Sequence, residues 1–223
     1  MRDDVSQLFP SDLSQKFEFY SYRNAGTVLA HKYAVVFKDL VNLLCSLNLS
    51  TQMIRMPGGN KGPIVKHIEG VISEQWKSEA RISADLKVTI DTKKPKESFD
   101  YINEGYLDGH QIDFLFDRVA LDIEWNSKDQ TFDRDLYALS TFYSAGAIDV
   151  GVIITRGTSI DDGVFLKSLG KTLNRDGTEG SDEVYSKFGA STTNMNKLLY
   201  RLDAGRNGGC PVLVIGLCKE AFS

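Results

Sequence analysis

The chain has 223 residues, of which 42% are hydrophobic, and a formal net charge of −4 at pH 7. This size and apolar content suit one well-buried domain over residues 1–223. No run of about 18 apolar residues occurs, which argues against a membrane partner, and MRDDVSQLF lacks the basic-then-apolar layout of a signal peptide. The mild negative charge argues against a protein that coats nucleic acid, but it permits one that encloses DNA in a local basic cleft.

The three cysteines, Cys45, Cys210 and Cys218, are odd in number and lack metal-ligand spacing. They indicate reduced thiols of a cytoplasmic protein. Neither they nor the three histidines point to a zinc site.

Apolar residues recur at threes and fours over residues 25–47 and again over 64–76, which predicts two scaffold helices. The segment between them, Met56–Pro63, has the composition of a loop. Lys61 lies among its glycines and is a candidate for contact with a phosphate.

The following stretch has weaker patterns. Residues 82–90 contain alternating apolar positions that predict a strand, and residues 91–98 form a polar, proline-containing turn. Residues 99–106 predict a short helix. No function follows from any of these segments.

The most informative stretch is residues 112–126, IDFLFDRVALDIEWN. With a period of two, one face of a strand takes Val119, Leu121, Ile123 and Trp125, and the other takes Ala120, Asp122, Glu124 and Asn126. The Cβ atoms of Asp122 and Glu124 are then roughly 6 to 7 Å apart. Asp113 precedes Asp122 on a short apolar run, which residues 116–118 would turn back into a hairpin.

These acids have two interpretations. Alternating acids on a strand are commonly its solvated face. However, residues 119–126 contain no Lys or Arg to balance Asp122 and Glu124, and like charges along one face cost energy. A hard divalent cation with oxygen ligands would relieve the repulsion.

A βαβ unit follows the hairpin. Ser127 and Gln130 fit a capping box that would start a helix, which carries an apolar face with Phe132, Leu136, Leu139 and Tyr143. A strand over 150–155 would then pair in parallel with the first strand. Asn126, Ser127 and Lys128 would lie at the helix N-terminus beside the carboxylates, where backbone amides favour a phosphate. Asp129 and Asp133 are taken as complements of the helix dipole.

The C-terminal third predicts helices over 163–173 and 192–202, separated by the polar segment 174–183, which we expect to be mobile without a partner. Residues 211–217 form an unbroken apolar run, typical of a strand that is covered on both faces. Together these elements predict an α/β fold with a central mixed β-sheet flanked by helices.

The spacing of Asp113, Asp122 and Glu124 resembles the active-site hairpin of the PD-(D/E)xK nucleases, with Glu124 where most of that superfamily has Lys. This departure is similar to the type II restriction endonucleases of the BglII, BstYI and BamHI group. The segments DFLFDRVALDIEW, IDVGVIITRG and CPVLVIGL resemble strands of that group in the same order. The resemblance implies a restriction-endonuclease-like core.

The resemblance also implies the roles of the acids. Asp113 and Asp122 would be the principal ligands of Mg²⁺, and Glu69 would be an outer or second-metal ligand, with Glu74 as its substitute. Glu124 would polarise the attacking water or act as a general base. The expected products carry a 5′-phosphate.

The implied substrate is double-stranded DNA with a short palindromic site, possibly GATC-centred, cut by a homodimer. A DNA methyltransferase would share that site without stable binding. Segment 158–210 would carry the recognition and dimerisation loops, with Arg156, Asn194, Asn196 and Arg206 as candidate DNA contacts, since Arg reads guanine and Asn reads adenine. The alternatives are a PD-(D/E)xK nuclease for repair or structure-selective cleavage, and a non-catalytic DNA-binding protein.

Overall fold

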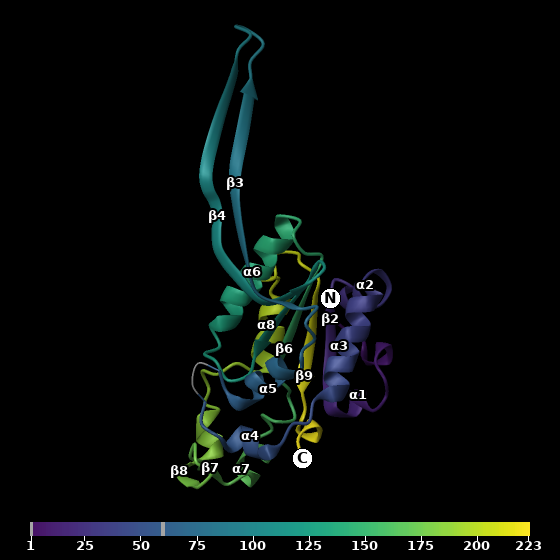
Figure 1. Cartoon of the computed structure of the whole chain (residues 1–223), viewed down its shortest axis with the longest axis vertical. Helices are drawn as coiled ribbons and strands as arrows, with labels where there is room; N and C mark the ends of the chain where they lie inside the picture. The colour runs from purple at the N-terminus through teal and green to yellow at the C-terminus, as the bar shows by residue number, and fades with distance from the viewer. Residues whose placement is uncertain (1, 59–60) are drawn as a thin grey trace.

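The computed structural model describes residues 2–58 and 61–223 and builds them around a seven-stranded sheet (Figure 1). Its strand order is β1-β2-β9-β6-β5-β4-β3. The three central strands β9, β6 and β5 are parallel, and the other neighbours pair antiparallel. The strands are β1 (Arg2–Asp4), β2 (Phe17–Tyr22), β3 (Lys77–Asp91), β4 (Ser98–Phe116), β5 (Val119–Glu124), β6 (Val150–Arg156) and β9 (Val212–Leu217). The mixed sheet confirms the predicted α/β class.

Helices cover both faces of this sheet. Side chains of α2, α3, α4 and α5 pack with one set of strand residues, and those of α6 and α8 pack with the other. Residues of β5 alternate between the two cores, as a period of two requires. The helices are α1 (Leu13–Lys16), α2 (Ala25–Lys32), α3 (Ala34–Ser46), α4 (Thr51–Arg55), α5 (Pro63–Val71), α6 (Thr131–Ser144), α7 (Phe165–Ser168) and α8 (Met195–Asp203).

Three predicted helices are shorter or interrupted in the structure. The helix predicted over 25–47 is interrupted at Tyr33, whose backbone leaves helical geometry at φ −115° and ψ 44° while its hydroxyl donates to Asp149. The helix predicted to reach residue 76 ends at Val71. Within 163–173 only α7 is helical, because Gly170 turns the chain at φ +67° into the short strand β7 (Lys171–Leu173).

The polar segment 174–183 forms the turn and second strand of a small exposed hairpin. β7 pairs antiparallel with β8 (Glu179–Glu183), and Asn174 N–H donates to the carbonyl of Thr178 across the turn. The hairpin lies at the opposite end of the molecule from the tip of β3 and β4 (Figure 1).

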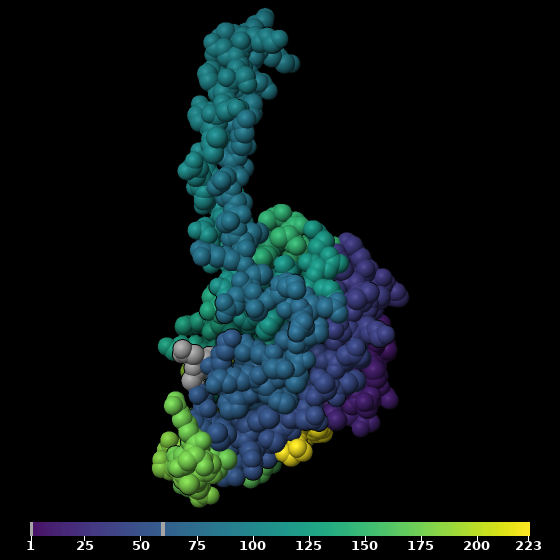
Figure 2. Space-filling model, in the orientation of Figure 1, coloured from purple at the N-terminus to yellow at the C-terminus, as the bar shows by residue number. Residues whose placement is uncertain are grey.

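The short helix predicted over 99–106 is wrong, because these residues belong to β4. They pair with β3 in the register Ile90–Phe99 and Val88–Tyr101, and the two strands leave the body of the protein as a long ribbon (Figures 1 and 2). We call residues 83–108 the arm. The strand predicted over 82–90 and the turn over 91–98 are confirmed.

The structure also bears on membrane spans and on the cysteines. Within residues 2–58 and 61–223, no helix is long and apolar enough to cross a membrane. Cys45, Cys210 and Cys218 are free thiols.

Candidate active site

The predicted hairpin brings Asp113 and Asp122 opposite each other on β4 and β5, one position beyond the paired residues Phe114 and Leu121. Each carboxylate binds the backbone of the other strand. The N–H of Asp113 donates to Asp122 Oδ1 at 2.8 Å, and the N–H of Ile123 donates to Asp113 Oδ2 at 3.0 Å. Side-chain oxygens thus replace ladder carbonyls as acceptors, and both carboxylates are held between the strands.

Glu124 and Asp135 extend this pair to a cluster of four acids. The side chains of Asp122, Glu124 and Asp135 are buried, because α6 packs over the β5 face that carries the first two. The interpretation of Asp122 and Glu124 as a solvated strand face is therefore wrong. Within the described part of the chain, one buried oxygen of each of these three residues (Asp122 Oδ2, Glu124 Oε2 and Asp135 Oδ2) has no hydrogen-bond partner.

Burial and mutual repulsion raise the pKa of every carboxyl in the cluster. Burial raises the pKa of Asp122 well above its ordinary value, and Asp135 and Asp113 raise it further. Burial, with Asp135 nearby, raises the pKa of Glu124 to about 8, and burial raises that of Asp135 to about 6. The pKa of Asp113 is raised mainly by burial as well. Without an added cation, the cluster therefore retains protons near neutral pH.

The cationic side chain of Arg134 contacts this cluster. Its guanidinium lies 2.9 Å from Asp135 Oδ1 and 3.7 Å from Glu124 Oε1, yet the side chain is 75% exposed. It also lines, with Asp113, His110 and Gln111, a cavity of about 310 Å³. Arg134 is thus bonded to the acids on one side and open to solvent on the other.

Glu69 of α5 lies across a cavity from Asp113. It lines a second cavity, of about 560 Å³, together with Asp113, and its charge contributes to the raised pKa of Asp113. Lys61 pairs with Glu69 at 2.7 Å. Glu74 lines the same cavity, so both acids proposed for this position share a cavity with Asp113.

The donor set suits a hard divalent cation, because it consists of carboxylate oxygens, three of them buried without a partner. Among residues 2–58 and 61–223, however, no three Asp, Glu, His or Cys side chains already form a group that could hold one ion. Binding of a cation would therefore require side-chain rotation within the cluster.

The turn that precedes α6 differs from the predicted capping box. The helix begins at Thr131, and its N-cap, Gln130, makes no side-chain capping bond. The turn instead binds the segment before α8: the N–H of Asp129 donates to the carbonyl of Ser191, and the N–H of Thr193 to that of Ser127. The N–H of Thr131 donates to the carbonyl of Lys128 within the turn. The backbone amides at the start of α6 are therefore not free, and contact of Asn126, Ser127 and Lys128 with a phosphate stays a prediction.

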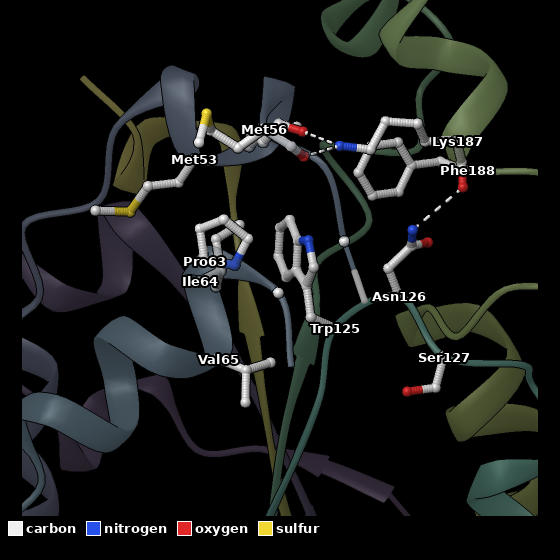
Figure 3. A pocket seen from close by; sticks show the side chains of 13 residues that line it. Met53, Met56, Pro63, Ile64, Val65, Trp125, Asn126, Ser127, Lys187 and Phe188 are labelled. Atoms are coloured by element: carbon white, nitrogen blue, oxygen red, sulfur yellow. Dashed lines mark hydrogen bonds between the residues drawn. The ribbon is translucent and has the colours of Figure 1, made fainter. Parts of the chain in front are cut away.

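The side chains of that turn lie beside a smaller cavity of about 190 Å³, shown in Figure 3. Trp125, Asn126 and Ser127 form one wall, and Asn126 donates to the carbonyl of Lys187. The ammonium of Lys187 donates to the carbonyls of Ile54 and Met56, and burial lowers its pKa to about 8. This lysine connects the segment after β8 to the loop after α4. Lys128, in contrast, is exposed.

Arg156 does not have the predicted orientation toward DNA. Its side chain is fully buried, and its guanidinium donates to Asp161 at 2.9 Å, to the carbonyl of Trp125 and to Thr192. It also stacks on Phe188. In this arrangement Arg156 holds the ends of β5 and β6 against the segment before α8, and its guanidinium is not accessible to a base.

The other candidate DNA contacts lie on or after α8. Asn194 is the N-cap of this helix, and its side-chain oxygen accepts from the N–H of Lys197. That oxygen is used for capping. Asn196 is exposed on the first turn, and Arg206 is about half exposed and pairs with Asp133 at 2.5 Å. Asn196 and Arg206 therefore remain accessible to a ligand.

A helix-flanked mixed sheet whose β4–β5 hairpin carries Asp113, Asp122 and Glu124 is a restriction-endonuclease-like fold. Residues 17–217 match the family model described as restriction endonuclease BglII/BglIII. The chain therefore belongs to this family of type II restriction endonucleases, and its class of activity is that of a DNA endonuclease. A comparison with curated proteins gives no significant match.

The prediction from sequence missed Asp135 and Arg134. A signal for Asp135 was present, because it lies three residues after Phe132 and four before Leu139, on the apolar stripe of the helix. An acid within an apolar stripe is rarely buried without a partner. Arg134 carries no comparable signal, since an exposed arginine on a helix is common.

Proposed function

We propose that this protein is an Mg²⁺-dependent type II endonuclease that cuts both strands of duplex DNA at a short palindromic site, with GATC at its centre, and leaves 5′-phosphate ends. It acts as a homodimer with one active site per chain, because a two-fold symmetric site presents equivalent bonds on both strands. A methyltransferase that modifies the same sequence would protect the host DNA without forming a stable complex.

The observation that carries this proposal is the cluster of Asp113, Asp122, Glu124 and Asp135, in which the last three are buried and each has an unpartnered oxygen. A cluster of buried carboxyls has little structural value, since buried acids destabilise a fold unless they are compensated. Because the chain belongs to a nuclease family, we assign the cluster a catalytic role.

Asp113 and Asp122 would hold Mg²⁺, with Glu69 contributing from the adjoining cavity. When bound, the ion lowers the pKa of coordinated water and neutralises charge on the phosphate. Glu124 orients the attacking water and accepts its proton, a task suited to a carboxyl whose pKa lies near the working pH. The water oxygen bonds to phosphorus, and the 3′-oxygen leaves.

Arg134 supplies the positive charge that Lys supplies in most of the wider superfamily. Glu124 occupies that Lys position, so the hairpin itself offers no cation for the scissile phosphate. The exposed guanidinium of Arg134 lies beside Glu124 and Asp135 and can contact a phosphate oxygen while it remains close to the acids. Asp135 orients this guanidinium through the 2.9 Å bond.

Recognition of the DNA is assigned to residues 158–210, within the single endonuclease domain. Asn196 and Arg206 are the accessible members of the predicted set. Lys61 lines the cavity that Asp113 shares, Ser127 lines the smaller cavity beside Trp125, and Lys128 is exposed; all three would contact the DNA backbone.

The test is digestion of a sequenced plasmid by the purified protein with Mg²⁺ and with EDTA, followed by sequencing of the product ends. Discrete fragments that require Mg²⁺ and share one end sequence are expected. Smears, or nicks at DNA structures, would instead indicate a structure-selective nuclease of the same superfamily.

Asp122→Asn provides the matched test of the site, with Asp108→Asn as the control. Asp108 forms an exposed ion pair with Arg81, away from the acidic cluster. Asp122→Asn should abolish cleavage and keep DNA affinity, whereas Asp108→Asn should cut as the wild type does. Cleavage by Asp122→Asn at the wild-type rate would rule out the assigned site.

A further inference from the structure

A cavity of about 370 Å³ lies between the residues that begin α5 and the β7–β8 hairpin. Three cationic side chains line it, those of Lys61, Lys66 and Arg175. The other residues that line it, within the part of the chain that the structure describes, are uncharged. We call this hollow the basic cavity.

The charges of the basic cavity are available to a ligand, because all three cationic residues are exposed. Lys61 pairs with Glu69 at 2.7 Å, but within residues 2–58 and 61–223 neither Lys66 nor Arg175 forms an ion pair. Asp176, next to Arg175 in the chain, accepts from the N–H and the hydroxyl of Thr178 in the hairpin turn. A hollow lined by one sign of charge concentrates ligands of the opposite sign. The basic cavity therefore suits an anion.

The basic cavity adjoins two other cavities. Lys61 also lines the cavity of about 560 Å³ that Asp113 shares, and Arg175 also lines a cavity of about 440 Å³ along the β7–β8 hairpin. The three hollows thus form a path from Asp113 to the hairpin, with the cations in its middle. A single small anion would fill only part of this path. An extended anionic polymer fits it, and each strand of DNA carries one phosphate per ~3.4 Å.

The far wall of this path is held in place by bonds to the body of the protein. Arg55 donates from Nε to the carbonyl of Lys171 in β7 at 2.8 Å. Lys187, after β8, donates to the carbonyls of Ile54 and Met56. The hairpin is therefore fixed beside α4 (Figure 1), and Arg175 in its turn is positioned before a ligand arrives. A site whose walls are already ordered loses less conformational entropy on binding.

We propose that the basic cavity binds backbone phosphates of the DNA that flanks the cleavage site, on the side of the β7–β8 hairpin. That these phosphates flank the cut rests on the proposed function, which places the scissile phosphate at Asp113. Lys66 and Arg175 contact phosphates and read no bases, so they add affinity without regard to sequence. The protein therefore binds DNA beyond its recognition sequence.

The salt dependence of binding tests these contacts. For a mixed-sequence duplex in EDTA, the slope of log Kd against log[KCl] counts the phosphates that the protein neutralises. Lys66→Ala and Arg175→Ala should each reduce this slope by about 1 and weaken binding about tenfold at ~0.1 M KCl. Lys66→Arg keeps the charge and should bind as the wild type does. Lys38→Ala is the control and should leave the slope unchanged, since Lys38 is exposed on α3 and lines none of the three cavities.

The length of the flanking DNA tests the position of the contacts. Two duplexes carry the site found by end sequencing, one that ends close to the site and one that extends beyond it by more than a helical turn on each side. With Ca²⁺ in place of Mg²⁺, the wild type should bind the longer duplex more tightly. Lys66→Ala and Arg175→Ala should lose this advantage and bind the shorter duplex as the wild type does.

Unchanged slopes, slope changes equal to that of Lys38→Ala, or equal losses of affinity on both duplexes would each overturn the inference. Thermal unfolding of every variant checks that a loss of binding is not a loss of folding. A wild-type protein that cuts no plasmid would overturn the proposed function. The slopes would still show whether the basic cavity binds phosphates, because they need neither cleavage nor a known site.

Discussion

Replacement of Arg134 by alanine should separate catalysis from stability. The side chain is 75% exposed but its partner Asp135 is buried, so its loss should lower the free energy of unfolding by about 1 to 3 kcal/mol. If the guanidinium contacts the scissile phosphate, the cleavage rate should fall about 10² to 10³-fold, or about 2.7 to 4 kcal/mol in the activation free energy.

The assay is single-turnover cleavage of a short duplex that contains the site found by end sequencing, at enzyme concentrations that saturate the DNA. Binding with Ca²⁺ in place of Mg²⁺ gives the affinity separately. Arg2→Ala is the control, because it removes an exposed arginine that pairs with Asp203 at 3.7 Å near the other edge of the sheet. A cleavage rate of Arg134→Ala within threefold of wild type would refute the assigned role.

Three further predictions address the acidic cluster, pH and packing. Asp135→Asn should raise the Mg²⁺ concentration for half-maximal cleavage about 10 to 100-fold, and an unchanged Mg²⁺ titration would contradict its placement in the site. The hydrogen bond from Arg118 holds the pKa of Asp149 well below its usual range. The ionised carboxylate therefore stabilises the fold above pH ~4, and this stabilisation is lost as the pH falls below that value. Asp149→Asn should lower the free energy of unfolding by about 1 kcal/mol at pH 7, which is ~2–4 °C in Tm, with the difference from wild type shrinking below pH 4 in thermal melts. Gly151→Ala should lower the free energy of unfolding, measured in urea, by about 1 to 3 kcal/mol, because a Cβ there would lie 2.7 Å from Leu139 Cδ1. A variant as stable as the wild type would mean that α6 moves away without cost.

The family assignment and the structure together decide between the two interpretations of Asp122 and Glu124. On the sequence alone, Asp122 and Glu124 were compatible with a solvated strand face. Burial under α6 excludes that interpretation and raises both pKa values. The same helix contributes Asp135 and Arg134, so α6 is part of the site and not only its scaffold.

The arm illustrates how local spacing misled the prediction. Phe99, Ile102 and Tyr106 recur at helical intervals, which favoured a short helix. Their conformation depends instead on pairing with β3, and Gly105 at φ +64° accommodates an irregularity that alters the alternation further along β4. Cross-strand contacts of this kind are not encoded in the spacing within one segment.

The sequence by itself determined the elements whose pattern is local and strong. The period of two in β5, the apolar stripe of α6 and the strand over 150–155 predicted the βαβ unit with its parallel pair, and the turn at residues 116–118 predicted the hairpin that carries Asp113 and Asp122. A pattern states which face of an element is apolar, but it does not state which neighbour covers the other face. Only the tertiary structure therefore decided that Asp135 joins the acids, that Arg156 is buried in a network of loops, and that the arm projects with its apolar face uncovered. Each of these depends on contacts between residues far apart in the chain, whose geometry is fixed only when the whole core packs.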